Sequence, residues 1–127
     1  MEDNKADVFL VEEAIAFHEI HAELQVITDG AEGIRRVEES NREDQPPDLF
    51  ILDLNLPKRS GLEILAAVRR NAKYAHIPVL VMTSSDSQKD RQETSRLGSS
   101  GYFRKPAGFD EFLEIGALIK SLIAGES

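Results

Sequence analysis

Short apolar runs alternate along the chain with longer stretches whose apolar residues recur at helical spacing. The runs are flanked by turn residues and are typical of buried strands. They comprise residues 24–27, 49–52 and 79–82 and a briefer run at 102–103. Helical spacing occurs around residues 8–15, 34–37, 62–68 and 112–122, and more weakly over 87–97. Strand alternating with helix predicts an α/β fold with a parallel sheet covered on both faces.

Length and composition restrict the classes of protein to consider. The chain has 127 residues and is 41% hydrophobic, which predicts a single domain over residues 1–127. It has no cysteine, which excludes disulfides and thiolate metal sites and suits a cytoplasmic protein. The apolar runs are too short to span a membrane. A net charge of -8 disfavours direct binding to nucleic acid.

Polar residues stand at the ends of successive predicted strands. The second run ends at Asp53, the third at Thr83, and the fourth is followed by Lys105-Pro106. The carboxyl ends of parallel strands form one edge of a sheet, where such folds bind ligands. An acidic pair, Glu2-Asp3, precedes the first helix and brings further carboxylates if it lies at the same edge.

This set of groups suits phosphoryl transfer. Clustered carboxylates repel one another, and Mg²⁺ relieves the repulsion while keeping positions for water and phosphate oxygens. A strand-end carboxylate can then attack phosphorus, with the metal and a lysine neutralising the charge that develops. Singly, each residue has a plainer interpretation, as a helix cap, a turn or a backbone partner. Their joint placement favours the site.

These residues lie in motifs that together resemble the receiver domain of two-component response regulators. The resemblance covers essentially the whole chain and is strongest for the stand-alone receivers that partner bacterial phytochrome-type sensor kinases. The motifs are residues 2–4 (EDN), 52–57 with Gly61 (LDLNLP and G), 78–84 (PVLVMTS) and 101–106 (GYFRKP). The resemblance implies a flavodoxin-like doubly wound sheet with strand order 2-1-3-4-5.

The resemblance also implies a phosphoacceptor and a metal site. Asp53 would accept a phosphoryl group from a kinase phosphohistidine. Mg²⁺ would be held by Asp3 and Asp53 through their side chains, by Glu2 directly or through water, and by the backbone carbonyl of Asn55. Neither Asn55 nor Ser85, at positions that tune dephosphorylation in the family, is acidic, which predicts a long-lived phosphorylated form.

Further residues would form the switch. Lys105 would contact the phosphoryl group, and Lys105-Pro106 would be a cis peptide, which costs little before proline. Thr83 would move toward the phosphate and Tyr102 would turn inward with it, although an aromatic beside a strand is more often simple packing. Conserved structural roles in the family would fall on Pro57 and Gly61. The three histidines match no catalytic or metal spacing, so we expect surface or packing roles for them.

One departure from the family pattern concerns the first strand. Family members begin with about five apolar residues before the acidic pair, whereas this sequence begins at Met1-Glu2. Losing four or five buried side chains at roughly 1.5–3 kcal/mol each would rival the stability of a domain. We therefore expect the chain to start upstream, another chain to supply a strand, or the sheet to close differently. Mg²⁺ affinity would be low if Glu2 and Asp3 fray.

Four functions follow from these features. The first is a phosphorylation switch, itself not an enzyme, that signals to a downstream protein or phosphotransfer partner and can form homodimers through its last helices. The second is a degenerate receiver that acts as an interaction module without phosphate. The third is a Mg²⁺-dependent aspartyl phosphatase, which lacks the second acid because position 55 is Asn. The fourth is flavin binding, for which the loop at residues 3–7 has the wrong charge.

Overall fold

The computed structural model describes residues 3–22, 24–27, 47–53, 58–71, 74–84 and 87–124. Within these ranges, the side chains of residues 3–7, 25 and 58–60 are not described. The helix expected around residues 34–37 lies outside the described residues. In the described part, no helix is long and apolar enough to cross a membrane.

Four parallel strands form one sheet, and each expected apolar run is a strand. They are β1 (Leu24–Ile27), β2 (Leu49–Asp53), β3 (Val79–Thr83) and β4 (Gly101–Arg104), in the order β1-β2-β3-β4. Every residue of β2 and β3 is buried, which explains why these two runs are continuously apolar up to their last residue. β4 is partly exposed and correspondingly less apolar.

The described sheet has the expected 2-1-3-4-5 order without its first strand, as the sequence predicted. That order places a strand between the equivalents of β1 and β2, but here these two pair directly, with Leu24 opposite Leu49 and Ile27 opposite Leu52. In the described residues the sheet is therefore closed across the position of the missing strand. Direct pairing satisfies backbone groups that a gap would leave without partners inside the protein.

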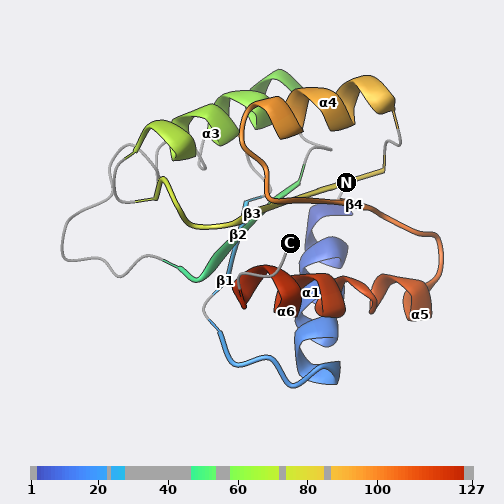
Figure 1. Ribbon diagram of the computed structural model, residues 1–127. Helices are drawn as coiled ribbons and strands as arrows, with labels where there is room; N and C mark the ends of the chain where they lie inside the picture. Colours follow the sequence, from blue (N-terminus) through green and yellow to red (C-terminus); the bar gives the residue numbers. More distant parts are fainter. Residues whose placement is uncertain are drawn as a thin grey trace.

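Helices cover both faces of the sheet (Figure 1). On one face lie α3 (Lys58–Arg70) and α4 (Gln88–Arg96); on the other lie α1 (Asp3–Phe17), α5 (Phe109–Phe112) and α6 (Ile115–Ile123). Each face has its own apolar core. The α3 core includes Ile64, Leu65 and Val68, and the α1–α6 core includes Val11 and Ile119.

Two helices differ from the expected pattern in detail. On α3, Leu65 and Val68 are buried as expected, but Ile64 is buried as well, while Leu62 is only partly covered. The stretch expected as one helix over residues 112–122 is divided into α5 and α6. The division lies where Leu113 contacts His18, just beyond α1. Apolar periodicity within one segment cannot reveal a contact with another segment.

His18, just beyond α1, packs at this division. Its Nε2 donates a hydrogen bond to the carbonyl of Leu113 at 2.9 Å. Gly116 is buried directly beneath the ring, and a Cβ at this position would overlap it. The packing role expected for His18 is thus confirmed. This contact joins the end of α1 to the junction of α5 and α6.

Candidate functional site

Asp53 and Lys105 form a buried ion pair at the carboxyl edge of the sheet. Asp53 is the last residue of β2 and is 0% exposed, while Lys105 follows β4. Lys105 Nζ donates to both carboxylate oxygens, at 3.1 Å to Oδ1 and 3.2 Å to Oδ2. The Lys105 side chain is 9% exposed. A charge this deeply buried is stable only with partners, so each group holds the other in place.

Thr83 is adjacent to this pair through the backbone. It is the last residue of β3, between β2 and β4, and is 3% exposed. The Lys105 amide donates to the Thr83 carbonyl at 2.8 Å, continuing the ladder that pairs Thr83 with Arg104. The three residues that sequence reasoning selected therefore lie on the ends of three neighbouring strands. Their roles in phosphoryl transfer remain predictions.

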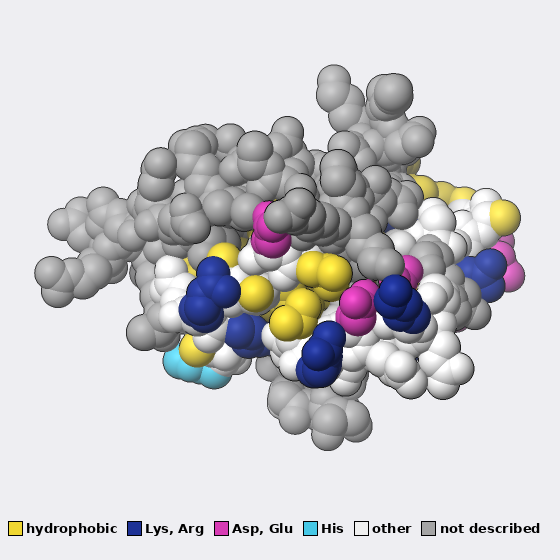
Figure 2. Space-filling model, turned by 90° about the horizontal axis from the view of Figure 1, so that it is seen from above, with side chains coloured by type: hydrophobic (Ala, Val, Ile, Leu, Met, Phe, Trp, Pro, Cys, Tyr) yellow, Lys and Arg dark blue, Asp and Glu magenta, His cyan; other side chains and the backbone are white. Residues whose placement is uncertain are grey.

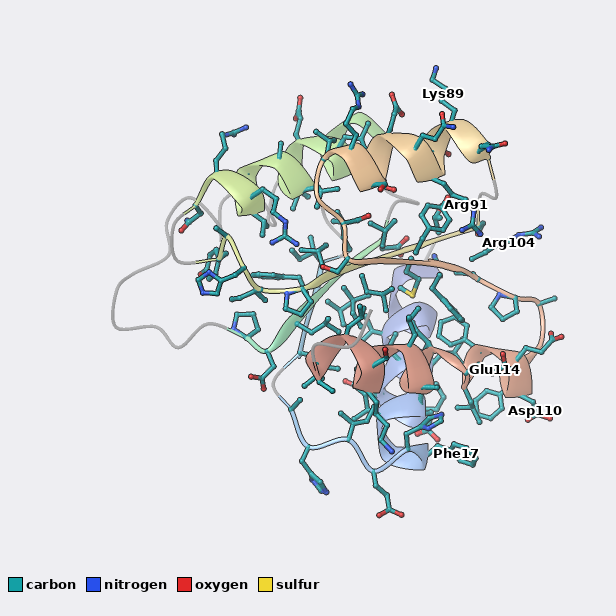
Figure 3. All side chains as sticks on the ribbon, viewed as in Figure 1. Phe17, Lys89, Arg91, Arg104, Asp110 and Glu114 are labelled. Atoms are coloured by element: carbon teal, nitrogen blue, oxygen red, sulfur yellow. The ribbon has the colours of Figure 1, made fainter. Side chains whose placement is uncertain are left out.

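Tyr102 lies on β4, the strand that precedes Lys105, and has a partner that the sequence did not suggest. It pairs with Val81 in the ladder and packs, partly buried, against the α3–α4 core. The guanidinium carbon of Arg91, on α4, lies 4.4 Å from the centre of the Tyr102 ring, within cation–π range. Figure 3 shows Arg91 extending from α4 toward β4. The sequence carries no signal for this contact, because it depends on how α4 crosses the sheet.

The prediction of a cis peptide bond between Lys105 and Pro106 is wrong. No peptide bond among the described residues is cis, and these include Lys105 and Pro106. The trans form is the lower in energy before proline, by about 0.5–1 kcal/mol. With this bond trans, Lys105 Nζ contacts Asp53.

The remaining predicted site residues are described in part or not at all. Glu2, Asn55 and Pro57 lie outside the described residues, as does the side chain of Asp3, whose backbone begins α1. Gly61 is buried in α3. Within the described part of the chain, no group of three or more His, Cys, Asp or Glu side chains could hold a metal ion. The carboxylate oxygens of Asp53 are of the ligand type that Mg²⁺ binds.

A shallow hollow lies along α4, apart from the ion pair. Its described lining consists of side chains that can donate hydrogen bonds: Gln88, Arg91, Gln92, Ser95 and Arg96. Figure 2, which views the α3–α4 side, shows Lys and Arg interspersed with Asp and Glu over the described surface. The described part of this face has no continuous basic field.

Comparison with known proteins places the chain among signalling proteins. Residues 1–116 match the response regulator receiver domain. The chain is 33% identical over 123 residues to response regulator Rcp1 of Synechocystis sp., covering 95% of this chain and 84% of that protein. A crystal structure of the phosphorylated cyanobacterial phytochrome response regulator RcpA has a TM-score of 0.80 at 32% identity, covering 98% and 90% of the two chains. The Mn²⁺-bound form of Rcp1 has a TM-score of 0.77 at 32% identity, covering 95% and 88%.

Proposed function

Because the chain belongs to the response regulator receiver domain family, we propose that it is a phosphorylation-activated signalling switch whose acceptor is Asp53. The observation that carries the proposal is the buried contact of Lys105 Nζ with both oxygens of Asp53. It places a cation beside the one group that would receive the phosphoryl anion. A similar protein, RcpA, whose crystal structure is of the phosphorylated form, supports a function that involves phosphorylation.

The proposed donor is the phosphohistidine of a sensor histidine kinase. A carboxylate oxygen of Asp53 attacks phosphorus in line, a P–O bond forms, and the P–N bond to histidine breaks. The electron pair of the broken bond stays on the histidine nitrogen, which takes up a proton. Lys105 Nζ holds the carboxylate before the transfer and pairs with the phosphoryl oxygens after it.

Magnesium is the proposed cofactor, in a family with a Mn²⁺-bound relative. Asp53 would hold it together with Glu2, Asp3 and the backbone carbonyl of Asn55. When bound, the metal neutralises charge on the transferring oxygens. Because Lys105 already neutralises part of the charge on Asp53, the metal adds to a site that is partly compensated without it.

The proposed switch acts through Thr83 and Tyr102. A phosphoryl group on Asp53 gives the Thr83 hydroxyl a new anionic acceptor, and movement of Thr83 opens space toward Tyr102. Phosphorylation shifts an equilibrium between two arrangements rather than creating a new fold. The stacking of Arg91 on Tyr102 extends this change to α4, where a downstream protein can detect it.

Incubation with acetyl phosphate and Mg²⁺ tests the proposal. We expect intact-mass spectrometry to show the gain of one phosphoryl group, which is lost in EDTA and lost in Asp53→Asn. The Thr83→Ala variant keeps the acceptor and is expected to be phosphorylated, but without the change at Tyr102. A phosphoryl gain that survives Asp53→Asn would overturn the assignment of the acceptor. No gain in the wild-type chain would favour the degenerate receiver instead.

We also propose that two copies pair through the face formed by α4, β4 and α5. Exposed cations lie on its α4–β4 part (Lys89, Arg91 and Arg104), and exposed carboxylates lie on its α5 side (Asp110 and Glu114), as Figure 3 shows. A two-fold axis would bring the basic part of one copy against the acidic part of the other, twice. The same surface is available to a downstream protein of matching charge.

Sedimentation of the unphosphorylated and phosphorylated forms measures this pairing. We expect Lys89→Glu to weaken a dimer through like-charge contact with the partner's acidic side. A mixture of Lys89→Glu with Asp110→Lys should form a heterodimer again, because the reversed charges match once more. Equal sedimentation of all forms would exclude this face as a dimer interface.

A further inference from the structure

Arg69, in the last turn of α3, connects two loops at the edge of the sheet opposite Asp53. Its Nη1 donates to carbonyls of the segment that leads into β3, at 2.8 Å to Ile77, 3.0 Å to Ala75 and 3.4 Å to Tyr74. Its Nε donates at 2.9 Å to the carbonyl of Gly98, in the segment that leads into β4. One guanidinium therefore holds the entrances of two adjacent strands at a fixed separation.

Ser100 completes the connection. Its amide donates to the Val79 carbonyl at 2.8 Å, and its hydroxyl accepts from the Val79 amide at 3.1 Å. Arg69 Nη2 approaches the same hydroxyl at 3.4 Å. Both backbone groups of the first residue of β3 are thus paired with the residue that precedes β4.

The hydrogen bonds of Arg69 hold backbone segments in position. Every hydrogen-bond acceptor that the described residues offer Arg69 is a carbonyl or hydroxyl oxygen, and burial lowers the pKa of the guanidinium from its usual value. Arginine still stays protonated at neutral pH. Gly98 has φ +104°, and a Cβ there would lie 2.9 Å from Arg69 Nε, so the contact leaves no room for a side chain.

The register of β4 against β3 decides which side chain reaches Asp53. Ser100 pairs with Val79, and the ladder continues from Leu80 opposite Gly101 to Thr83 opposite Arg104, after which the Lys105 amide donates to Thr83. Successive side chains of a strand point to opposite faces, so a slip of one residue would turn Lys105 away from the site.

We infer that Arg69 and Ser100 form a remote register lock that holds β4 against β3 and thereby keeps Lys105 on Asp53. Arg69 is a positioning residue, because it acts on the site through the backbone of β4. The sheet needs such a device on this side because β4 is an edge strand, paired only with β3 in the described sheet. This inference rests on the proposed function only where it concerns phosphorylation.

Amide hydrogen exchange in Arg69→Met tests the lock, with Arg70→Met as a matched control on an exposed neighbour in the same helix turn. We expect exchange of both the Ser100 and the Lys105 amides to accelerate by about tenfold or more, since a lost hydrogen bond to a charged group changes a local opening equilibrium by at least that factor. The β1–β2 ladder and the Arg70→Met variant should stay near wild type.

Two other patterns would overturn the inference. Faster exchange at Ser100 with an unchanged Lys105 amide would mean that Arg69 stabilises only the nearby loops. Equal acceleration of all strands would mean a general loss of stability. Ser100→Ala removes only the hydroxyl and gives the same test if Arg69→Met does not fold; there too the Lys105 amide must exchange faster.

Phosphorylation provides a second readout. With acetyl phosphate and Mg²⁺, at a temperature where both proteins are folded, Arg69→Met is expected to gain the phosphoryl group several-fold more slowly than Arg70→Met, in the manner of a misplaced catalytic group. An equal rate with a faster-exchanging Lys105 amide would show that register does not limit the reaction. If the wild-type chain takes no phosphate, the proposed function fails while the exchange experiment still decides on the lock.

Discussion

Replacing Lys105 by methionine removes the cation beside Asp53 and keeps most of the buried side-chain volume. Asp53 is 0% exposed and the Lys105 side chain 9% exposed, so water has little access to the carboxylate that remains. Breaking a buried pair by removing one partner costs about 3–5 kcal/mol. The apolar stem of lysine is replaced by methionine atoms, so loss of packing contributes little. We therefore expect Lys105→Met to lower the free energy of unfolding by about 3–5 kcal/mol.

The free energy of the interaction between Lys105 and Asp53 is measured by a double-mutant cycle that combines Lys105→Met with Asp53→Asn. The double variant has neither charge and should be destabilised by less than the sum of the two single changes, with a coupling of about 2–3 kcal/mol, at the upper end of the range for directly contacting residues. Urea unfolding followed by far-ultraviolet circular dichroism, in EDTA to exclude divalent cations, gives each free energy. The exposed Lys120→Met change serves as a control and should stay within about 0.5 kcal/mol of wild type.

Additive effects would refute this reasoning. A coupling below about 0.5 kcal/mol, within the additivity of independent sites, would mean that Lys105 and Asp53 do not depend on each other in solution. A Lys105→Met variant as stable as the Lys120→Met control would mean the same. Either result would also remove the observation on which the assignment of Asp53 as acceptor depends.

Three further predictions concern the switch, the α5–α6 junction and the metal. Arg91→Ala removes a cation–π contact worth about 0.5–1 kcal/mol and should change the fluorescence of Tyr102; the chain has no tryptophan, so replacing the other tyrosine by phenylalanine isolates this signal. Unchanged emission would show that the ring does not depend on Arg91. Gly116→Ala should lower stability in urea by about 1–3 kcal/mol through overlap with His18, and combining it with His18→Ala should recover part of that loss; equal loss in both backgrounds would contradict the contact. Mg²⁺ should raise the melting temperature of the wild-type chain but not of Asp53→Asn, and an equal rise in both would place the metal elsewhere.

The sequence predicts the strands well because burial on both faces determines their composition. Leu49 to Leu52 and Val79 to Met82 were expected as strands, and each extends by one polar residue, Asp53 or Thr83, that belongs to the site. The polar residue is part of the strand because its backbone continues the ladder. The ends of the apolar runs thus indicated both the sheet and the edge where the candidate site lies.

Contacts between distant segments explain what the sequence did not predict. The division between α5 and α6 lies where His18, from the other end of the chain, hydrogen bonds to Leu113. Arg69 and Arg91 look like ordinary surface cations in a helical stretch, and their partners lie outside their own helices, in loops for Arg69 and in β4 for Arg91. Pairing of β1 with β2 also depends on the assembled sheet.

The contacts of Arg69, Arg91 and the Asp53–Lys105 pair lie at different points along β4. The Arg69 cluster fixes β4 at its entrance, and the Asp53–Lys105 contact fixes it at its exit. Between these two points, Tyr102 packs, partly buried, against the α3–α4 core, and the guanidinium of Arg91 stacks on its ring. We expect a phosphoryl group on Asp53 to change the position of the Tyr102 ring while the two ends of β4 stay in place. The predicted response of β4 is therefore at Tyr102, the residue that contacts Arg91 of α4.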